Sequence, residues 1–292
     1  MIGIVILNYN EWELTINCIR YIRENCSIPY RIYVVDNASP KRASKVQSDF
    51  FEASNDCKLI VNVSNKGYSA GNNVGIKNAI DDNCSHIIIS NNDIIFKKDS
   101  IETLKNYLDN NMNYGIVGPK VFRPDGSIQE INMRCKMTMS GKYKYIIRNT
   151  PLGFIGKKFV NEFHVQEKDV NKTFDVYAVS GCCFMMSLDV AKQIYPLDEN
   201  VFLYEEENII GHKMEALNKK TAYVVESEVI HLGGASTDGL SSFSYACFVR
   251  SEQYYCKTYL RAKLYQRLPL YCIRVAIGVG KYGIGVLKEL KK

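Results

Sequence analysis

Carboxylates in two places, with asparagines nearby, are the residues of this chain best suited to chemistry. Asp93 follows the polar residues 90–92, and Glu205, Glu206 and Glu207 are consecutive. A carboxylate at a strand end is a candidate oxygen ligand for Mg²⁺ or Mn²⁺. Adjacent acids repel one another, which raises a pKa toward the range of a useful general base. His231, which precedes Leu232 and two glycines, is a candidate further contact for a metal or a phosphate.

Each of these candidates also has a purely structural explanation. The asparagines before Asp93 favour a tight turn, because they bond to their own main chain. Three acids at the start of a helix stabilise the helix dipole. A single histidine is often a structural residue. The residues alone leave both explanations open.

The elements that must position these groups follow from the hydrophobic pattern. Short apolar runs at 2–7, 32–35, 59–63 and 87–89 indicate strands, and helical patterns follow the first, third and fourth of them. We expect capping boxes at two of these helices, formed by Asn10 with Glu13 and by Asp99 with Glu102. The alternation predicts an α/β fold with a mostly parallel central sheet flanked by helices.

Polar residues follow each of the four predicted strands. Parallel strands share one carboxyl edge, so these residues should converge into a pocket. Asp36 could accept hydrogen bonds from a base or from ribose hydroxyls. Gly67 and Gly71 would let the backbone approach phosphates, although the loop is neither G-x-G-x-x-G nor a Walker A motif. A nucleotide with a metal-bridged diphosphate fits best. The predicted edge residues are Asn8, Asn10, Asp36, Asn37, Asn65, Gly67, Gly71, Asn72, Asn92 and Asp93.

The second half of the chain is less regular. We expect a catalytic domain over 1–240, with a nucleotide-binding half (1–112) and an acceptor and catalytic half (113–240), and a helical extension over 241–292. A hairpin and an irregular excursion are expected in residues 127–175. The other expected elements are strands at 115–121, 176–180, 182–186, 221–225 and 228–231, a flexible loop at 233–237, and a helix at 244–268.

Composition restricts the function classes. The 292 residues are 46% hydrophobic, and the ten cysteines form no C-x-x-C pair, which indicates reduced thiols and neither a disulfide scaffold nor structural zinc. The chain enters a strand at once, so we expect a cytoplasmic protein. Residues 257–292 hold nine basic residues and one acid, whereas the whole chain carries +6. The body therefore has no basic surface for nucleic acid.

The basic tail has a regular spacing. Arg267, Arg274, Lys281 and Lys288 recur every seven residues, with apolar residues between them. On a helix they would form a basic stripe suited to anionic lipid, which predicts a peripheral protein on the cytoplasmic face of a membrane. The longest charge-free run is too short to span a bilayer. A solvated helix and a contact between copies of the chain, as in a homo-oligomer, are the alternatives.

Seven motifs together resemble the family 2 glycosyltransferases of the GT-A fold, especially the rhamnosyltransferase-like enzymes of bacterial surface polysaccharide synthesis. They are NYN (8–10), VVDNAS (34–39), NVSNKGYSAGNNVGI (62–76), SNNDI (90–94), SGCCFMMS (180–187), FLYEEENIIGHKM (202–214) and HLGGAST (231–237). The resemblance covers about residues 1–260. It implies inverting transfer of a sugar, rhamnose or a hexose, from a dTDP- or UDP-sugar to a hydroxyl. If the tail binds membrane, the acceptor is expected to be a polyprenyl-diphosphate-linked saccharide.

The resemblance also assigns roles. It implies that Asp36 binds the base or ribose with Asn8 and Asn10 beside it, and that the 65–72 loop lies on the nucleotide side. Asn92-Asp93 stands where the family has an Asp-x-Asp metal motif, so Asp93, supported by His231, would hold Mg²⁺ or Mn²⁺. Glu207, or else Glu206, would be the base, although the family often has Glu-Asp there. The competing hypothesis is a catalytically inactive nucleotide-sugar-binding scaffold of the same fold.

Overall fold

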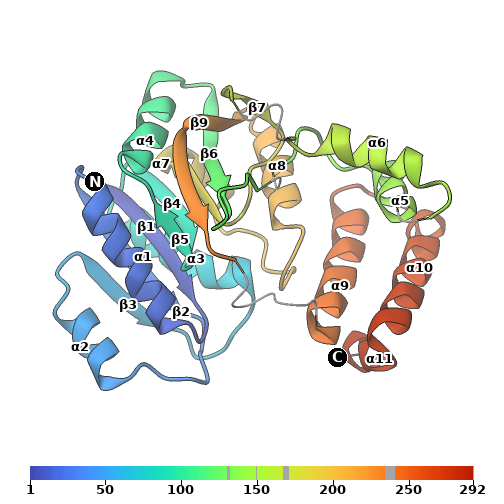
Figure 1. Cartoon of the computed structure of the whole chain (residues 1–292), viewed down its shortest axis with the longest axis horizontal. Helices are drawn as coiled ribbons and strands as arrows, with labels where there is room; N and C mark the ends of the chain where they lie inside the picture. The colour runs from blue at the N-terminus through green and yellow to red at the C-terminus, as the bar shows by residue number, and fades with distance from the viewer. Residues whose placement is uncertain (130–131, 149, 167–170, 234–240, 292) are drawn as a thin grey trace.

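The computed structural model describes residues 1–129, 132–148, 150–166, 171–233 and 241–291. Its centre is a sheet whose first half is parallel (Figure 1). Strand β1 (Ile2–Asn8) lies between β2 (Tyr30–Asp36) and β4 (His86–Asn91), and β3 (Cys57–Val61) borders β2. These four strands agree with the apolar runs in the sequence.

The second half of the sheet is mixed, and the prediction of a mostly parallel sheet holds for β1–β4 and for the pair of β6 with β9. Strand β8 (Cys183–Ser187) runs antiparallel to β4 and to β6 (Tyr114–Phe122). Strand β9 (Lys220–His231) is parallel to β6 and pairs antiparallel with β5 (Ile94–Phe96) near one end and β7 (Phe174–Val176) near the other. We expected two short strands in place of β9. The chain instead continues through one strand, with an irregularity in its register opposite Pro119–Lys120.

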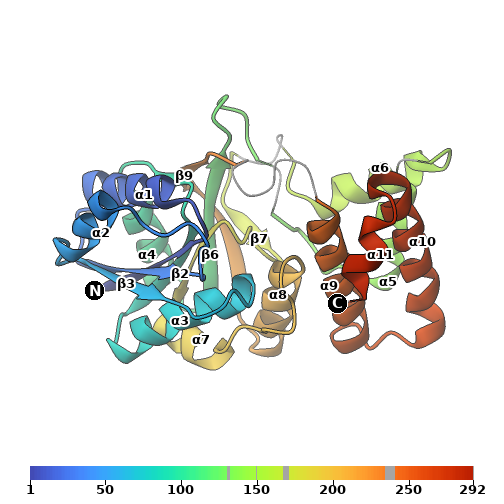
Figure 2. The ribbon, with the colours of Figure 1, turned by 90° about the horizontal axis from the view of Figure 1, so that it is seen from below.

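Two apolar cores cover the faces of the sheet. Ile4 and Ile6 point to the face covered by α1 (Trp12–Asn25) and α4 (Ser100–Asn110), whereas Val5 points to the face covered by α3 (Tyr68–Asp81) and α7 (Leu188–Ile194). Figure 2 shows α1 and α3 on opposite sides of the sheet, and α2 (Lys45–Glu52) lies beside α1. Burial on both faces explains the run 87–89, which shows no polar alternation.

The predicted hairpin and irregular excursion in 127–175 were wrong for most of their length. This region contains α5 (Met139–Ile147) and α6 (Gly153–Phe163). Thr138 caps α5, because its hydroxyl accepts a hydrogen bond from the Gly141 N–H at 3.1 Å. The helical pattern was hidden because α5 buries a lysine, Lys142, which is only 4% exposed.

The predicted helix at 244–268 is confirmed over 244–258 but does not continue to 268 as one helix. Helix α9 (Ser242–Thr258) ends there, and α10 (Leu264–Tyr282) begins after a break and is followed by α11 (Gly285–Leu290). The break includes Arg261, whose φ of +50° is left-handed and ends regular helix. Figure 1 shows α5, α6, α9, α10 and α11 grouped beside the sheet. The expected loop at 233–237 lies outside the described residues except for Gly233.

Neither predicted capping box forms. Glu11 is the N-cap of α1, and Asn10 instead has a φ of +67° and accepts from the Lys41 N–H at 2.9 Å. Asp99 precedes α4 with a left-handed backbone and makes no side-chain cap. Both Asn10 and Asp99 have a left-handed backbone, whereas an N-cap residue with a capping side chain normally has an extended one.

The basic stripe predicted for the tail is interrupted. Arg274 faces the protein interior and pairs with Glu252 of α9, and Arg267 is half-buried, whereas Lys281 and Lys288 are exposed. The outward face of α10 is apolar, with Leu264, Leu268, Ile273 and Ile277 exposed. In the part of the chain that the structure describes, no helix has the length and apolar character needed to cross a bilayer. All ten cysteines are free thiols.

Candidate active site

The carboxyl ends of β1, β2 and β4 bring their polar side chains into contact. Asn8 Nδ2 donates to Asp36 Oδ1 at 2.8 Å, and the Thr15 hydroxyl donates to Asn8 Oδ1 at 3.0 Å. Asn92 Nδ2 donates to Thr15 Oγ1 at 3.0 Å. The convergence inferred from strand order is therefore present as a continuous hydrogen-bonded network.

Asp36 is buried within this network. Its carboxylate accepts from Asn8, from the Ser39 hydroxyl and, at 3.2 Å, from the Ser39 N–H. Asn10 joins the same turn, because its backbone N–H donates to Ser39 Oγ at 2.7 Å. The carboxylate thus fixes the turn after β2 and lies at the edge where a donor would bind; its contact with a base or ribose stays a prediction.

Asn37 connects this turn to the loop before α3. Its Nδ2 donates to Asn65 Oδ1 at 2.9 Å and to the Gly67 carbonyl at 3.1 Å, while Asn65 Oδ1 also accepts from the Gly67 N–H at 2.9 Å. Asn72 is fully buried, and its Nδ2 donates to the Tyr68 carbonyl at 3.0 Å. Among the described residues, Asn72 Oδ1 has no hydrogen-bond partner.

Packing within the protein accounts for both loop glycines, whereas we expected phosphate approach to be the reason. Gly67 has a φ of +97°, and a Cβ there would lie 2.3 Å from the Phe202 carbonyl oxygen. A Cβ on Gly71 would lie 2.5 Å from Leu7 Cδ1. The Tyr68 N–H donates to the Phe202 carbonyl at 2.9 Å. Because Gly67 has no side chain, Phe202, which lies three residues before Glu205, can pack against the start of α3.

The two predicted metal ligands meet across β5 and β9. Ile94 pairs with His231, and His231 Nε2 lies 3.2 Å from Asp93 Oδ1. The other imidazole nitrogen, Nδ1, is 2.9 Å from Gln129 Oε1, and Asp93 Oδ2 accepts from the Gly233 N–H at 3.2 Å. Gln129 therefore orients a histidine that the sequence alone did not connect to it.

These two groups fit a divalent cation as a partial ligand set. Asp93 Oδ1 is buried without an aligned hydrogen bond among the described residues, and oxygen with imidazole nitrogen suits Mg²⁺ less than Mn²⁺. The described ranges contain no cluster of three or more His, Cys, Asp or Glu side chains arranged for a metal. A cation at Asp93 and His231 would need further ligands from a bound diphosphate or from water.

The three glutamates enter helix α8 (Glu206–Ala216) through a strained turn. Tyr204 and Glu205 have φ angles of +73° and +71°, which L-residues adopt only at a cost. Burial, followed by the charge of Glu207, raises the pKa of Glu206 well above its ordinary value, and among the described residues Glu206 Oε1 has no hydrogen-bond partner. Burial also raises the pKa of Glu207.

Glu207 receives a hydrogen bond from a segment that is distant in the sequence. The Gly181 N–H donates to Glu207 Oε1 at 3.1 Å, which favours the ionised carboxylate. A Cβ on Gly181 would lie 3.0 Å from that oxygen and 3.4 Å from the Tyr68 hydroxyl. Because the charge of Glu207 raises the pKa of Glu206 further, Glu207 is the more readily ionised of the two acids, and its role as the base stays a prediction.

Tyr68 is a site residue that the sequence reasoning missed. Its hydroxyl donates to the Gly181 carbonyl, and its pKa is raised well above the ordinary value by burial and then by the charge of Glu207. The available signal was its position between Gly67 and Gly71 in a loop already assigned to the strand-end edge.

Cys182 connects the two carboxylate sites. The Asn91 N–H donates to the Cys182 carbonyl at 2.8 Å, beside Asp93. Burial raises the pKa of the Cys182 thiol to about 12, and the charges of Asp93 and Glu207 both contribute. Both carboxylates are thus within electrostatic range of the same thiol, on the segment 181–182.

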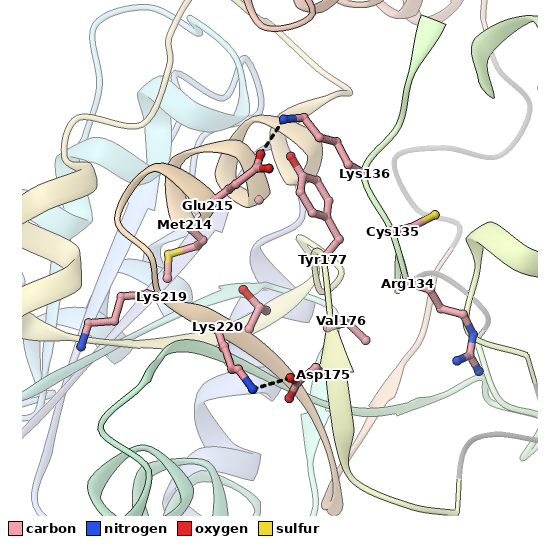
Figure 3. A pocket seen from close by; sticks show the side chains of 12 residues that line it. Arg134, Cys135, Lys136, Asp175, Val176, Tyr177, Met214, Glu215, Lys219 and Lys220 are labelled. Carbon is pink, nitrogen blue, oxygen red and sulfur yellow. Dashed lines mark hydrogen bonds and ion pairs between the residues drawn. The ribbon is translucent and has the colours of Figure 1, made fainter. Parts of the chain in front are cut away.

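One hollow of the described part of the molecule lies away from this site. This hollow, of 310 Å³, is lined by residues of β7, β9 and the later turns of α8 (Figure 3). Its charged residues include two ion pairs, Lys136 with Glu215 and Lys220 with Asp175. It contains none of the predicted site residues. The candidate active site is therefore defined by the strand-end network and not by this hollow.

The fold and the site define an α/β protein with a polar network at the carboxyl edge of its sheet, where α/β proteins commonly bind ligands. Residues 3–195 match the model of the glycosyl transferase family 2, and the chain belongs to that family. Its fold is of the GT-A type. The resemblance seen in the sequence motifs is confirmed at the level of the family.

Similar proteins agree with this placement. The chain is 27% identical over 207 residues to the low-salt glycan biosynthesis hexosyltransferase Agl10 of Haloferax volcanii, covering 70% of this chain and 59% of that protein. The crystal structure of GalNAc-T7 with UDP, GalNAc and Mn²⁺ matches with a TM-score of 0.61 at 12% identity, covering 97% of this chain and 58% of that one.

A second solved structure is TarS 1–349 of S. aureus in complex with UDP. It matches with a TM-score of 0.55 at 11% identity, covering 96% of this chain and 72% of that one. At these identities the two structures show the shared fold. The chain spans less than two thirds of the length of the Haloferax protein and of the GalNAc-T7 chain.

Proposed function

We propose that this protein is an inverting glycosyltransferase that moves a hexose or rhamnose from a UDP- or dTDP-sugar to a hydroxyl of a growing bacterial surface glycan. The observation that carries the proposal is the placement of Glu207 and Asp93 around the 181–182 segment, beside the strand-end network. The names of the similar proteins, a glycan biosynthesis hexosyltransferase and two UDP-bound structures, support a nucleotide-sugar donor.

Glu207 is the proposed base. Burial raises its pKa toward neutrality, where a carboxylate removes a proton most effectively, and the Gly181 N–H still favours the ionised form. Glu207 accepts the proton of the acceptor hydroxyl as that oxygen bonds to the anomeric carbon. The bond from that carbon to the diphosphate breaks on the opposite face, so the configuration inverts and the nucleoside diphosphate leaves with the electron pair.

Glu206 has a different proposed role. Its carboxylate is buried with one oxygen unpaired among the described residues, and its pKa is raised by burial and by Glu207. The neutral acid is the favoured form at this position. A protonated Glu206 adds no second negative charge beside Glu207, and this leaves Glu207 as the carboxylate that ionises.

The donor is proposed to lie along the network of Asp36, Asn8, Asn10, Asn37 and the 65–72 loop, with Asn92 at the junction to Asp93. Asp93 and His231 would hold Mg²⁺ or Mn²⁺, which when bound offsets the charge of the diphosphate. Gln129 and the Gly233 N–H orient these two ligands.

The acceptor is proposed to be lipid-linked and presented at the cytoplasmic face of a membrane. The outward face of α10 exposes Leu268, Ile273 and Ile277, and Lys281 lies on the same helix. Phe154 of α6 is 70% exposed in the same group of helices. An apolar helix face with flanking lysines suits shallow insertion into an anionic surface.

Vesicle flotation tests this part of the proposal. The protein should float with vesicles that contain anionic lipid, and Ile273→Ser with Ile277→Ser should weaken the binding, while Lys105→Ser on the distant helix α4 should not. Absence of binding to any vesicle, with dimers in solution that the serine variant dissociates, would assign the apolar face to a second copy of the chain.

A donor panel tests the catalytic proposal. Thermal shift with UDP- and dTDP-sugars, with and without Mn²⁺, should identify a donor, because a bound ligand raises the melting temperature. The same donors should then show release of nucleoside diphosphate in the presence of a glycan acceptor. Donor binding without turnover for every donor and metal would favour the inactive scaffold.

A further inference from the structure

A buried network of ion pairs includes Glu205, the first of the three consecutive glutamates. It joins Glu205, at the start of α8, to Lys142 of α5, Glu252 of α9 and Arg274 of α10, three helices that Figure 1 shows grouped beside the sheet. Lys142 Nζ donates to Glu205 Oε1 and lies 3.9 Å from Glu252 Oε1. Arg274 donates two hydrogen bonds to Glu252, at 2.9 and 2.8 Å.

The four charges balance one another. Glu252 is fully buried, and Lys142, Glu205 and Arg274 are each less than 10% exposed. The second oxygen of Glu205 accepts from Asn208 Nδ2 at 2.9 Å. Buried charges are tolerated only where each has a partner, so two carboxylates and two cations form a closed set. Although burial favours the neutral amine, the carboxylates keep the pKa of Lys142 above its ordinary value.

The network acts on the turn that carries the glutamates. Tyr204 and Glu205 have left-handed backbones, which surrounding contacts must maintain. Helix α9 supplies one such contact, because the Ser251 hydroxyl donates to the Leu203 carbonyl at 2.7 Å. Lys142 supplies the other through the Glu205 side chain. The direction in which Glu207 leaves this turn, toward Gly181, depends on both contacts.

We propose that Lys142 is a positioning residue for Glu207, acting through Glu205, and that the helices α5, α9 and α10 are structural parts of the active site. This inference rests on the proposed function of Glu207. It also gives Arg274 a different role from the one predicted for the basic stripe of the tail. Arg274 completes the network through Glu252.

The charges that face Glu207 come from several elements. Glu205 and Glu206 lie on its own turn, Tyr68 on α3 and Cys182 before β8. Cys247 of α9 lies near Glu206, and Lys142, Glu252 and Arg274 surround Glu205. Of these, Glu205 is the group whose charge raises the pKa of Glu207 and whose partner is Lys142.

The test uses the full chain with a donor that the wild-type protein turns over. Lys142→Met should lower kcat by about tenfold or more while the donor KM stays within about threefold, because geometry at the base and not donor contact is lost. The matched control is Lys136→Met. It removes the ion pair between Lys136, which lies just before α5, and Glu215, near the end of α8. The control should leave kcat within about twofold.

Glu205→Gln gives an independent readout. The amide keeps an oxygen for Lys142 but removes the charge, so the pKa of Glu207 should fall and the acid limb of the pH–rate profile should move to lower pH. Combining Glu205→Gln with Lys142→Met removes the unpaired carboxylate and should recover part of the activity lost in Lys142→Met.

Each outcome decides the proposal. A kcat for Lys142→Met equal to that of the Lys136→Met control would overturn it, even if the melting temperature falls. Should Lys142→Met not fold, Glu205→Gln decides, and an acid limb at the wild-type pH overturns the proposal. A wild-type protein with no turnover would instead contradict the proposed function, before any variant is compared.

Discussion

Glu207 and Gly181 are joined by a hydrogen bond in which the Gly181 N–H donates to Glu207 Oε1 at 3.1 Å. Gly181 begins the segment that leads into β8, and its carbonyl accepts from the Tyr68 hydroxyl at the start of α3. Three segments distant in the sequence therefore meet at this carboxylate. The bond favours the ionised form of a group whose burial favours the neutral form, and the balance suits a general base.

Gly181→Ala should damage catalysis more than stability. A Cβ would lie 3.0 Å from Glu207 Oε1, so the carboxylate must move by a few tenths of an ångström. We expect kcat to fall by about tenfold or more with a loss of only about 1–2 kcal/mol in the free energy of unfolding. Steady-state kinetics and chemical denaturation check this. Unchanged kcat would show that the Gly181 contact does not set the position of the base.

Gly67→Ala should destabilise the fold. The residue has a φ of +97° and a Cβ there would lie 2.3 Å from the Phe202 carbonyl oxygen, so strain and a steric clash add. A loss of about 2–4 kcal/mol is expected from the left-handed backbone and overpacking together.

Gly126→Ala is the control for Gly67→Ala. Gly126 has a φ of +83° with nothing within 4 Å of a Cβ, so it reports the backbone cost alone, about 1 kcal/mol. Denaturant unfolding measures the loss in the free energy of unfolding for each variant. Equal losses would show that the backbone at Phe202 shifts away from the added Cβ at little cost.

Asp93→Ala should remove any dependence of transfer on the divalent cation. Asp93 and His231 are 3.2 Å apart and form the proposed partial ligand set, in which the carboxylate is the sole acid. Titration of Mn²⁺ against the rate of nucleoside diphosphate release measures this. Full activity of Asp93→Ala with the wild-type response to Mn²⁺ would show that residues 92 and 93 serve only as a turn.

Glu206→Gln should raise stability at alkaline pH. Burial and Glu207 raise the pKa of Glu206 in the folded state, so the folded protein holds a proton that the unfolded chain releases near its ordinary value, about 4.3. Wild-type stability should therefore decline as the pH rises from that value through the raised folded pKa. Glutamine removes this contribution. Urea unfolding at a series of pH values measures the free energy of unfolding of both proteins. If this free energy changes with pH in the same way for both, the pKa of Glu206 does not differ between the folded and unfolded states.

The sequence was most informative where burial and periodicity agreed. The run 87–89 predicted a strand covered on both faces, and the strand-end asparagines do meet in space. It was least informative where charges are buried. Lys142 and Arg274 have partners, Glu205 and Glu252, that are distant in the sequence, so no local pattern indicates that these two cations are buried. The strand predicted at 182–186 is present as β8, but its antiparallel pairing with β4 was not predicted, because that pairing joins segments far apart in the sequence.

The central claim is that Glu207 is the base of a sugar transfer from a nucleotide donor. The most direct measurement compares wild-type protein and Glu207→Gln for donor binding and for acceptor-dependent release of nucleoside diphosphate. The account predicts that Glu207→Gln binds the donor with an affinity within about threefold of the wild type but loses about 10²–10⁴-fold in kcat. Retention of wild-type kcat in Glu207→Gln would contradict it.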